Sequence, residues 1–572
     1  HWEPLKHHVP PGLTPLFADV PVSAIRHAQV LWQQALEWSY FNDVMLGIRQ
    51  TYTPRQEPAA KTPVFQTLMC IDDRTCSLRR HLHLAAPGCE TFSTPGFFGV
   101  EFYFQPEGAK FYTRSCPAPI NPGYLIRETG RTRFHQQDRN LSKNSHGLVK
   151  GWLTANTLGL GSAVRLLTGI LKPELNPVMS YSFDHMDKNA GLTIDSTGET
   201  EYGLQVGFTV EDMVTRASAV LKSIGLTRNF APLVYIIGHG GSSVNNTYYA
   251  GYECGACCGR PGSVNARVFA YFLNKPEVRE GLREEGIEIP GTSVFVGALH
   301  DTTRDEIQYF DHVITREEHL QMHLENRKVI EKALQANARE RSFRFDSIDS
   351  SLPAEKIHEK VKRRSVSLFE PRPEWNHTAA ALTIVGRYSL IEHLYLDKRA
   401  FVNSYDSRQD PEGHYLLNIL RAAVPVSGGI ALEYYFSRVD QQKLGAGTKL
   451  PHNVVGLFAV ANGTEGDLRP GLPSQMIEIH DPLRMHFILE QKPEVVLRIV
   501  QSDARLYEWI LNEWVLLSVF DPETGTFTRF KGGELHPFTP LERALEKVSA
   551  DPELRYFETQ KSPVLIIEPS YA

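Results

Sequence analysis

Short continuous runs of apolar residues mark the chain between about residues 60 and 300. Residues 64–70, 233–237 and 293–297 are dense in β-favouring apolar side chains, and polar residues follow each run. Such runs predict strands that are buried on both faces of a sheet. Residues 210–224 and 265–273 lie among them and have helical periodicity. Because strands alternate with helices, the pattern predicts an α/β fold with a mostly parallel sheet.

Weaker patterns flank this core. Residues 22–46 and 75–83 predict helices, residues 98–104 predict a strand, and residues 107–150 predict a long irregular segment rich in Pro and Gly. The charged, helix-prone residues 315–362 predict a solvated helical excursion. A second set of strand and helix patterns follows at 382–385, 454–460 and 485–530. No repeat at a fixed period is visible.

The length of 572 residues exceeds what one hydrophobic core usually organises, so we expect several parts. These are an N-terminal segment at 1–60, a first domain at 61–314, the charged excursion at 315–364, and a C-terminal α/β or α+β domain at 365–572. The chain begins at His1, without an initiator Met or a secretory signal pattern. We therefore expect a fragment, a processed product or an ordered core.

Charge and cysteine content narrow the function classes. The formal net charge is −6, from 60 basic and 66 acidic residues, and this balance argues against a nucleic-acid-binding protein. The seven cysteines are an odd number and include the cluster at 254, 257 and 258, which points to a reducing compartment and to metal or thiol chemistry. Residues 152–171 have the length of a membrane span but contain polar residues such as Arg165. This favours an amphipathic helix against a partner, or a core helix.

Candidate chemistry follows two of the predicted strands. Cys70, Asp72 and Arg74 come at the end of the first, and His239 directly follows the strand at 233–237. If the two strands are neighbours, Cys70 and His239 meet at one sheet edge, where ligands bind in open α/β sheets. The loop after His239 could return Cys254 to the same place. Two thiolates and an imidazole suit zinc, with Asp72 or water in the fourth position.

Each feature also has a plainer interpretation. A single cysteine at a strand end is more often a small buried hydrophobe, and Gly-His-Gly is more often a turn. Cys-x-x-Cys-Cys at 254–258 also fits a structural zinc knuckle or a redox pair. Asp72 itself has two possible roles: it can bind zinc and close the site, or pair with Arg74 and leave a position for water.

The Cys-x-Asp-x-Arg motif with a later His and Cys resembles the zinc site of β-type carbonic anhydrases. In the soluble enzymes the His and second Cys are only a few residues apart, whereas here fifteen positions separate His239 from Cys254. With this departure, the chain resembles the DabA family of inorganic carbon accumulation complexes. The resemblance rests on motifs across most of the chain from about residue 60, including Asn245-Asn246, His300-Asp301-Thr302-Thr303, Arg372-Pro373-Glu374-Trp375, Ser404-Tyr405-Asp406-Ser407-Arg408 and His480-Asp481-Pro482-Leu483-Arg484.

The resemblance implies a first domain folded like β-carbonic anhydrase, with Cys70, Asp72, His239 and Cys254 as zinc ligands and Arg74 as the partner of Asp72. Cys257 and Cys258 match the motif but not the ligand positions, so they would support the site. It also implies a protein peripheral to the cytoplasmic face of the inner membrane, bound to a DabB-like proton-conducting membrane subunit. The pair would hydrate CO2 to bicarbonate in one direction.

Two other functions stay open: a free-standing carbonic-anhydrase-like enzyme, and a non-catalytic zinc scaffold. The segment 152–171 is the candidate surface for the membrane partner. Five polar residues of the second part are candidates for a pocket or a proton path, although satisfied polar groups in loops are the commoner case: His452, Asp467, Arg469, His480 and Arg484.

Overall fold

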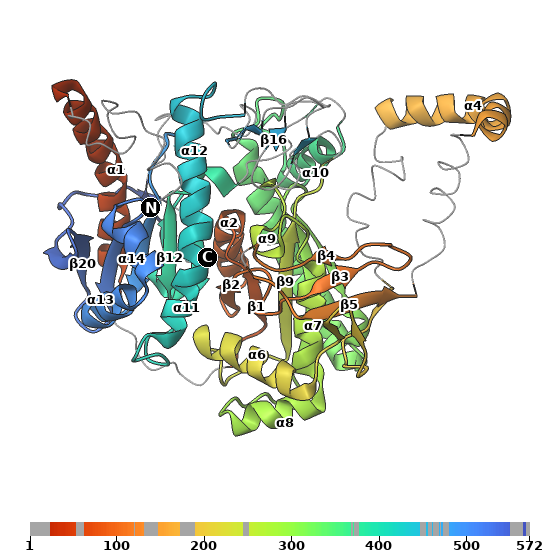
Figure 1. The fold of residues 1–572 in the computed structure, drawn as a ribbon, viewed down its shortest axis with the longest axis horizontal. Coiled ribbons are helices and arrows are strands. Elements are labelled where there is room, and N and C mark those ends of the chain that lie inside the picture. Colours follow the sequence, from red (N-terminus) through yellow and green to blue (C-terminus); the bar gives the residue numbers. More distant parts are fainter. Residues whose placement is uncertain are drawn as a thin grey trace, which may run out of the picture.

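The computed structural model describes residues 23–52, 62–118, 120–130, 147–171, 189–243, 251–367, 370, 377–446, 454–455, 460–461, 468–469, 471–472, 480–548 and 564–567. The protein has an α/β fold, as the sequence predicts, and it contains two large sheets (Figure 1). The strands of the first sheet, in spatial order, are β11 (Glu306–Phe310), β10 (Val294–Asp301), β9 (Leu233–Gly240), β1 (Gln66–Cys70) and β2 (Glu90–Thr94).

The first sheet is parallel except at one edge. β1 pairs in parallel with β2 and β9, β9 pairs in parallel with β10, and only β11 runs antiparallel. Alternate residues of β9 face opposite layers of helices. Val234 and Ile236 share a core with α6 (Val210–Ser223), α7 (Ser263–Asn274) and α8 (Pro276–Glu284). Tyr235 and Ile237 share another with α2 (Asp73–Ala85) and α9 (Glu317–Ser342).

The charged segment after residue 315 is helical, as predicted, but it is not a solvated excursion. Ile330, Ala333 and Leu334 of α9 are buried against α2 and the sheet. α10 (Ala354–Ser365) in turn packs on α9. The segment therefore has a narrow apolar stripe despite its high charge. Its charged residues tolerate burial because they pair inside the protein, as Arg341 does with Asp305.

A small sheet beside the core corrects two predictions. The predicted strand 98–104 exists only at its end, because a turn occupies residues 96–99 and Phe98 has a φ of 51°. The segment expected to be irregular contributes the six-residue strand β5. The strands of this sheet are β3 (Tyr103–Gln105), β4 (Thr113–Arg114), β5 (Tyr124–Thr129), β6 (Gly191–Leu192), β7 (Thr200–Glu201) and β8 (Leu204–Val206).

The second large sheet repeats the strand order of the first. In spatial order it contains β14 (Ala400–Ser404), β12 (Leu382–Gly386), β18 (His486–Glu490), β19 (Leu516–Asp521), β20 (Thr526–Lys531) and β21 (Glu534–Phe538). When the strands are numbered along the chain, the first four lie side by side in parallel in the spatial order second, first, third, fourth. The fifth strand, β20, pairs with the fourth in the antiparallel direction. The first sheet has the same order, so the chain contains two topologically equivalent halves.

The halves meet at their second strands, β2 and β14. The Ser93 amide donates to Ser404 Oγ at 2.9 Å, and Ser93 Oγ donates to the Val402 carbonyl at 2.5 Å. The Val402 amide donates to the carbonyl of Ile71 at 3.2 Å. This seam therefore places the segment directly after β1 against the second half.

Helices cover both faces of the second sheet. α13 (Pro493–Ser502) and α14 (Ala504–Leu511) lie on one face, and α1 (Ala24–Thr51) packs on the other through Phe41, Val44 and Leu46. α1 is the helix predicted near the N-terminus, and its Glu37 pairs with Arg484 of the second half. The predicted domain boundaries stay predictions. Short strands complete this half: β13 (Leu394–Tyr395), β15 (Val454–Val455), β16 (Val460–Ala461), β17 (Leu468–Arg469), β22 (Lys547–Val548) and β23 (Leu565–Ile567).

Two long helices differ in their surroundings. α11 (His414–Ala423) and α12 (Gly429–Val439) form one rod interrupted by a π-helical turn at Val424–Gly428. Among the described residues, this rod alone is long and apolar enough to cross a membrane, with a mean hydropathy of 1.4 and 39% of that stretch buried. α4 (Leu148–Leu171) confirms the helix predicted at 152–171 and stands apart from the two sheets in Figure 1.

Candidate metal centre

Three predicted ligands come together at the carboxyl edge of the first sheet. Cys70 ends β1, and His239 is the last residue but one of the neighbouring strand β9. Cys254 reaches them from the loop that follows β9. One ligand atom from each lies within 4.8 Å of the others, and all three side chains are buried. The parallel pairing of β1 with β9 produces this arrangement, as the sequence predicts.

Tight backbone packing holds the two thiols together. The Cys254 carbonyl accepts hydrogen bonds from the amides of Cys257 and Gly259, each at 3.0 Å, which closes the loop. Gly96, after β2, approaches so closely that a Cβ there would lie 2.8 Å from the Sγ atoms of both Cys70 and Cys254. Cys257 donates to the Gly96 carbonyl at 3.4 Å and so supports the loop.

Asp72 and Arg74 form a clasp beside this cluster. Arg74 Nε donates to Asp72 Oδ1 at 2.7 Å, and Arg74 Nη2 donates to Asp72 Oδ2 at 2.9 Å. Asp72 also caps α2 by accepting from the Arg74 amide at 3.0 Å. Its Oδ2 lies 3.5 Å from His239 Nε2. Burial would raise the pKa of Asp72, but the charge and hydrogen bonds of Arg74 hold it well below the usual range.

The donor set fits zinc. Burial raises the pKa of the Cys70 and Cys254 thiols well above the ordinary value, so neutral thiols are favoured where no cation is present. A divalent cation reverses this preference, because coordinated thiols lose their protons. Two cysteines and a histidine in a buried pocket leave one position for Asp72 or water, which is the pattern of a zinc site.

A small apolar cavity opens onto the cluster. Its volume is about 50 Å³, whereas a single water molecule needs at least about 10–15 Å³. Cys70, Asp72 and His239 line one side of it. The opposite side comes largely from the second half of the chain. The apolar lining residues are Ile71, Pro95, Pro117, Ala256, Phe401, Ala422, Ala423, Val426 and Ile430. The rod formed by α11 and α12 thus covers the cavity, and the π-helical turn of the rod lies over it.

His377 is a lining residue that the sequence did not single out. It begins a short 3-10 helix, His377–Ala379, at the start of the second half. Burial and the nearby charge of Arg74 lower the pKa of His377 to about 4, so its imidazole is neutral at pH 7. No local pattern marks it, since its position depends on how the two halves pack.

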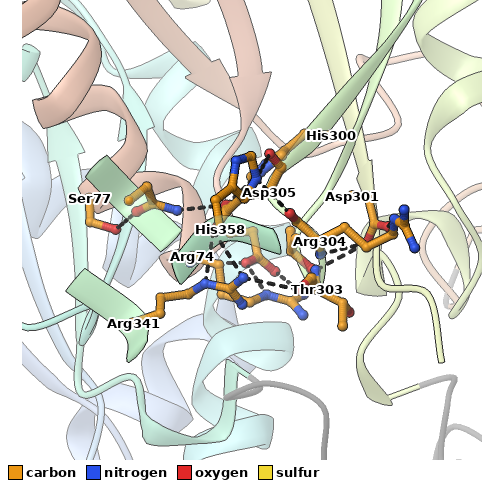
Figure 2. Close-up of polar contacts among 12 residues, drawn as sticks. Arg74, Ser77, His300, Asp301, Thr303, Arg304, Asp305, Arg341 and His358 are labelled. Carbon is orange, nitrogen blue, oxygen red and sulfur yellow. Dashed lines mark hydrogen bonds and ion pairs between the residues drawn. The ribbon is translucent and has the colours of Figure 1, made fainter. Parts of the chain in front are cut away.

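A buried polar network lies behind the metal ligands (Figure 2). His300 faces His239 in the pairing of β10 with β9, and its Nε2 lies 3.2 Å from Asp305 Oδ1. Arg341 of α9 pairs with Asp305 at 2.9 Å, and Asn337 links Asp305 to Ser77 of α2. His358 Nε2 lies 3.0 Å from the carbonyl of Asp305. The network ties α2, which carries Arg74, to three other elements.

The remaining predicted residues do not gather at this centre. Cys258 is half-buried and lies outside the three-residue cluster. Arg484 is engaged by Glu37, and His480 Nε2 lies 3.8 Å from Asp397. His452, Asp467, Asn245, Asn246 and the segment 372–375 lie outside the described residues, as does the side chain of Arg469.

Comparisons with known proteins give one consistent family. Residues 18–515 match the family model described as "Probable inorganic carbon transporter subunit DabA". A relative of that name from Azotobacter vinelandii is 53% identical over 570 residues, which is 99% of this chain and 67% of the relative. One from Nitrosospira multiformis is 49% identical, covering 96% and 60%, and a "DabA 2" from Sorangium cellulosum is 39% identical, covering 91% and 53%. The chain thus spans about half to two thirds of these relatives. No solved structure matches it.

Proposed function

We propose, starting from the fact that this chain belongs to the DabA family of probable inorganic carbon transporter subunits, that it hydrates CO2 to bicarbonate as the zinc-holding subunit of a membrane complex. One observation carries the proposal. A cavity of about 50 Å³ with mainly apolar walls is lined by Cys70 and His239, two of the three clustered candidate ligands, and by the ionised carboxylate of Asp72. An apolar molecule of three heavy atoms suits such a space, and a carboxylate can orient the water that attacks it.

The residues have separate roles in this proposal. Cys70, His239 and Cys254 would hold zinc, which lowers the pKa of a bound water and so supplies a nucleophile at neutral pH. Asp72 would accept a hydrogen bond from the attacking water, and Arg74 keeps Asp72 ionised and fixes its orientation. The alternative position of Asp72, directly on the metal, would close the site. The covered cavity excludes bulk water from the reacting atoms.

A membrane partner completes the proposal. The relatives are named as subunits, which supports a complex, and we propose a DabB-like proton-conducting subunit that removes the proton of hydration. The complex would sit at the cytoplasmic face of the inner membrane. Exposed apolar side chains support such docking: Trp32 of α1, Trp152 of α4 and Phe436 of α12 are all exposed. In Figure 1, α1 and α12 extend toward the upper side of the view, and α4 lies across its upper right.

The test compares variants of the full complex in membrane vesicles, with zinc content and CO2 hydration measured together. Cys254→Ala is expected to lose zinc and hydration. Asp72→Ala is expected to keep zinc and lose hydration by at least about 100-fold, because general acid–base groups contribute roughly that much. Cys258→Ala is the matched control in the same loop and should keep both.

Other outcomes identify the alternatives. Hydration at the full rate by the purified chain without membranes would indicate a free-standing enzyme. Unchanged carbon uptake by cells that carry Asp72→Ala would indicate a structural zinc site. Full zinc occupancy in Cys70→Ala or His239→Ala would contradict the ligand assignment.

A further inference from the structure

The equivalence of the two halves extends to their clefts. The small cavity beside the candidate metal ligands, called the metal pocket below, is lined on one side by Cys70 and His239 at the ends of β1 and β9 in the first half. Its cover comes from the segment between the second and third strands of the second half, and Phe401 of β14 lines one wall. Exchanging the two halves predicts a counterpart at the ends of β12 and β18, covered by the segment between the second and third strands of the first half.

A cleft lies close to that position, at the ends of β12 and β14. This cleft of about 980 Å³ is lined by residues after β12, including Arg387 and Tyr388, and by residues after β14, including Asp406 and Arg408. Residues 224–229, which follow α6 between β2 and β9, cover it. Thr91 of β2 lines it where Phe401 of β14 lines the metal pocket. The two cavities therefore share the end of the first strand, one wall from the other half's second strand and a cover from the other half, whereas the third strand contributes His239 to the metal pocket and none of the described residues lining the second cleft.

The second cleft also contains an Asp–Arg clasp, although this clasp follows β14, the second strand of its sheet, whereas Asp72 and Arg74 follow β1, the first strand of the other. Arg408 Nε and Nη2 donate to Asp406 at 3.2 and 3.0 Å, and the Arg408 amide donates to Asp406 Oδ1 at 3.2 Å. Arg74 makes the same three contacts with Asp72. None of the described residues that line the cleft is a cysteine. At the end of β12, Gly386 occupies the position that Cys70 occupies in β1, and Arg387 follows it.

Three arginine side chains line the cleft and could donate hydrogen bonds to a ligand: Arg228, Arg387 and Arg408. Among the described residues, Arg228 makes no ion pair. Arg408 binds Asp406 and Arg387 binds Glu490, in both cases through Nε and Nη2, and Arg387 also interacts with Tyr52. Hydrogen bonding to Asp406 raises the pKa of Arg408, whereas the charge of Arg387, which lines the same cleft, lowers it.

The carboxylates nearby already have partners. Glu490 accepts from Arg387, Asp406 accepts from Arg408, and Glu90 accepts from Gln66 at 2.7 Å. The fourth, Glu392, lies 3.4 Å from His393, and burial raises its pKa, which favours its neutral form. Hydroxyl groups of Thr91, Ser389 and Ser404 complete the polar lining. Guanidinium forks with hydroxyl groups suit a planar oxyanion, which they bind through paired hydrogen bonds.

We propose that this cleft is a second, metal-free site that binds a small planar oxyanion of the carboxylate type. The identity of that anion as bicarbonate rests on the proposed function, whereas the site itself does not. Arg228 and Arg408 bind the anion from the cleft side, and Arg387 supplies a third donor from the sheet edge.

Isothermal titration of the purified full chain tests the site, with sodium bicarbonate and sodium acetate as probes at constant pH and ionic strength. The metal-free Cys254→Ala protein is titrated in parallel, so that anion binding at zinc is removed. We expect saturable binding that survives Cys254→Ala and weakens about tenfold or more in the double variant Arg228→Gln/Arg408→Gln, because that variant loses two charged hydrogen-bond donors to the anion. Arg421→Gln, an exposed arginine outside the cleft that pairs with Asp503, is the matched control and should bind normally.

Two results overturn the inference: no saturable binding in Cys254→Ala, or binding that the double variant leaves unchanged. Thermal unfolding and zinc content of the double variant establish that it is folded. A failure of the proposed function gives a different result, because anion binding would persist in a chain without CO2 hydration. Binding of acetate but not bicarbonate would overturn the assignment of the anion.

Discussion

Asp305 is a fully buried carboxylate whose side chain joins two elements, α9 and β10. Arg341, Asn337 and His300 all contact it. Burial would raise its pKa, but the charge of Arg341 and the bond to His300 hold the pKa well below the usual range. The side chain is therefore ionised and satisfied.

We expect Asp305→Ala to destabilise the protein by about 3–5 kcal/mol, because it leaves the buried Arg341 charge without its partner. Urea unfolding measures the effect. The matched control is Glu280→Ala, which removes an exposed carboxylate paired with Arg283 and should change stability by less than about 1 kcal/mol. Equal effects of the two substitutions would contradict the importance of burial.

Gly96 and Gly255 give a second residue-scale prediction. A Cβ at position 96 would meet both candidate thiol ligands at 2.8 Å, whereas a Cβ at position 255 would meet no atom within 4 Å. We expect Gly96→Ala to push Cys70 and Cys254 apart and to weaken zinc binding at least about tenfold, since displaced ligands lose coordination geometry. Competition with a chelator measures this affinity. Gly255→Ala should bind zinc like the natural chain, and equal zinc affinity in both variants would be inconsistent with the site.

At the scale of elements, two adjacent glycines at the π-helical turn of the rod differ in the space around them. A Cβ on Gly428 would lie 2.7 Å from Val515 Cγ1, whereas a Cβ on Gly429 would face open space. Gly428→Ala is expected to cost about 1–3 kcal/mol through overpacking. Gly429→Ala should be neutral or stabilise by up to about 1 kcal/mol, because alanine favours a helix. Thermal unfolding distinguishes the two, and a destabilising Gly429→Ala would show that the turn needs flexibility there.

The elements that the sequence predicted well are those with strong local patterns. The apolar runs at 64–70, 233–237 and 293–297 are β1, β9 and β10, and their neighbouring positions brought Cys70 and His239 together. Local patterns failed where packing decides. Phe98 and Val100 are apolar and buried, yet the chain turns there. The π-helical turn has no apolar rhythm of its own, so the cover of the cavity could not be predicted.

At the scale of the whole molecule, the equivalence of the two halves was hidden from the sequence. It consists of strand order and parallel pairing, which depend on contacts between distant residues. The motif containing Asp406 and Arg408 was visible, but its likeness to Asp72 and Arg74 has meaning only once both sheets are known. Cys70 and His239 could be predicted because each lies at the end of a strong strand, whereas His377 and Phe401 required the docking of the halves.

Buried histidines give the whole molecule a pH dependence. Burial lowers the pKa of His83 and His377 to about 4 and that of His486 to about 3. In the unfolded chain these groups have a pKa near 6.5, so the unfolded state binds more protons between about pH 6.5 and 4. Stability should therefore fall as the pH decreases through this range, by on the order of 2 kcal/mol per histidine at pH 5.

Urea unfolding of the metal-free Cys254→Ala protein at pH 8 and pH 5 measures this loss without zinc release. His486→Phe should reduce the difference between the two pH values, because His486 packs among aromatic rings and a phenyl ring cannot be protonated. A difference that is unchanged in His486→Phe would contradict the assignment of His486.

The packing of α1 against the second half has a consequence for synthesis. Glu37 cannot pair with Arg484 until Arg484 has been synthesised, 447 residues later. At common elongation rates this takes roughly 20–90 s. All three candidate metal ligands emerge by residue 254, whereas the cover of the cavity follows with Phe401 and Val426. Nascent chains thus pass through a stage in which all three candidate ligands have been synthesised but the residues that cover the cavity have not. We expect metal to enter the site at that stage. Ribosome-bound chains stalled near residue 330 should take up zinc faster than the finished metal-free protein, and equal rates would show that the finished cavity admits metal freely.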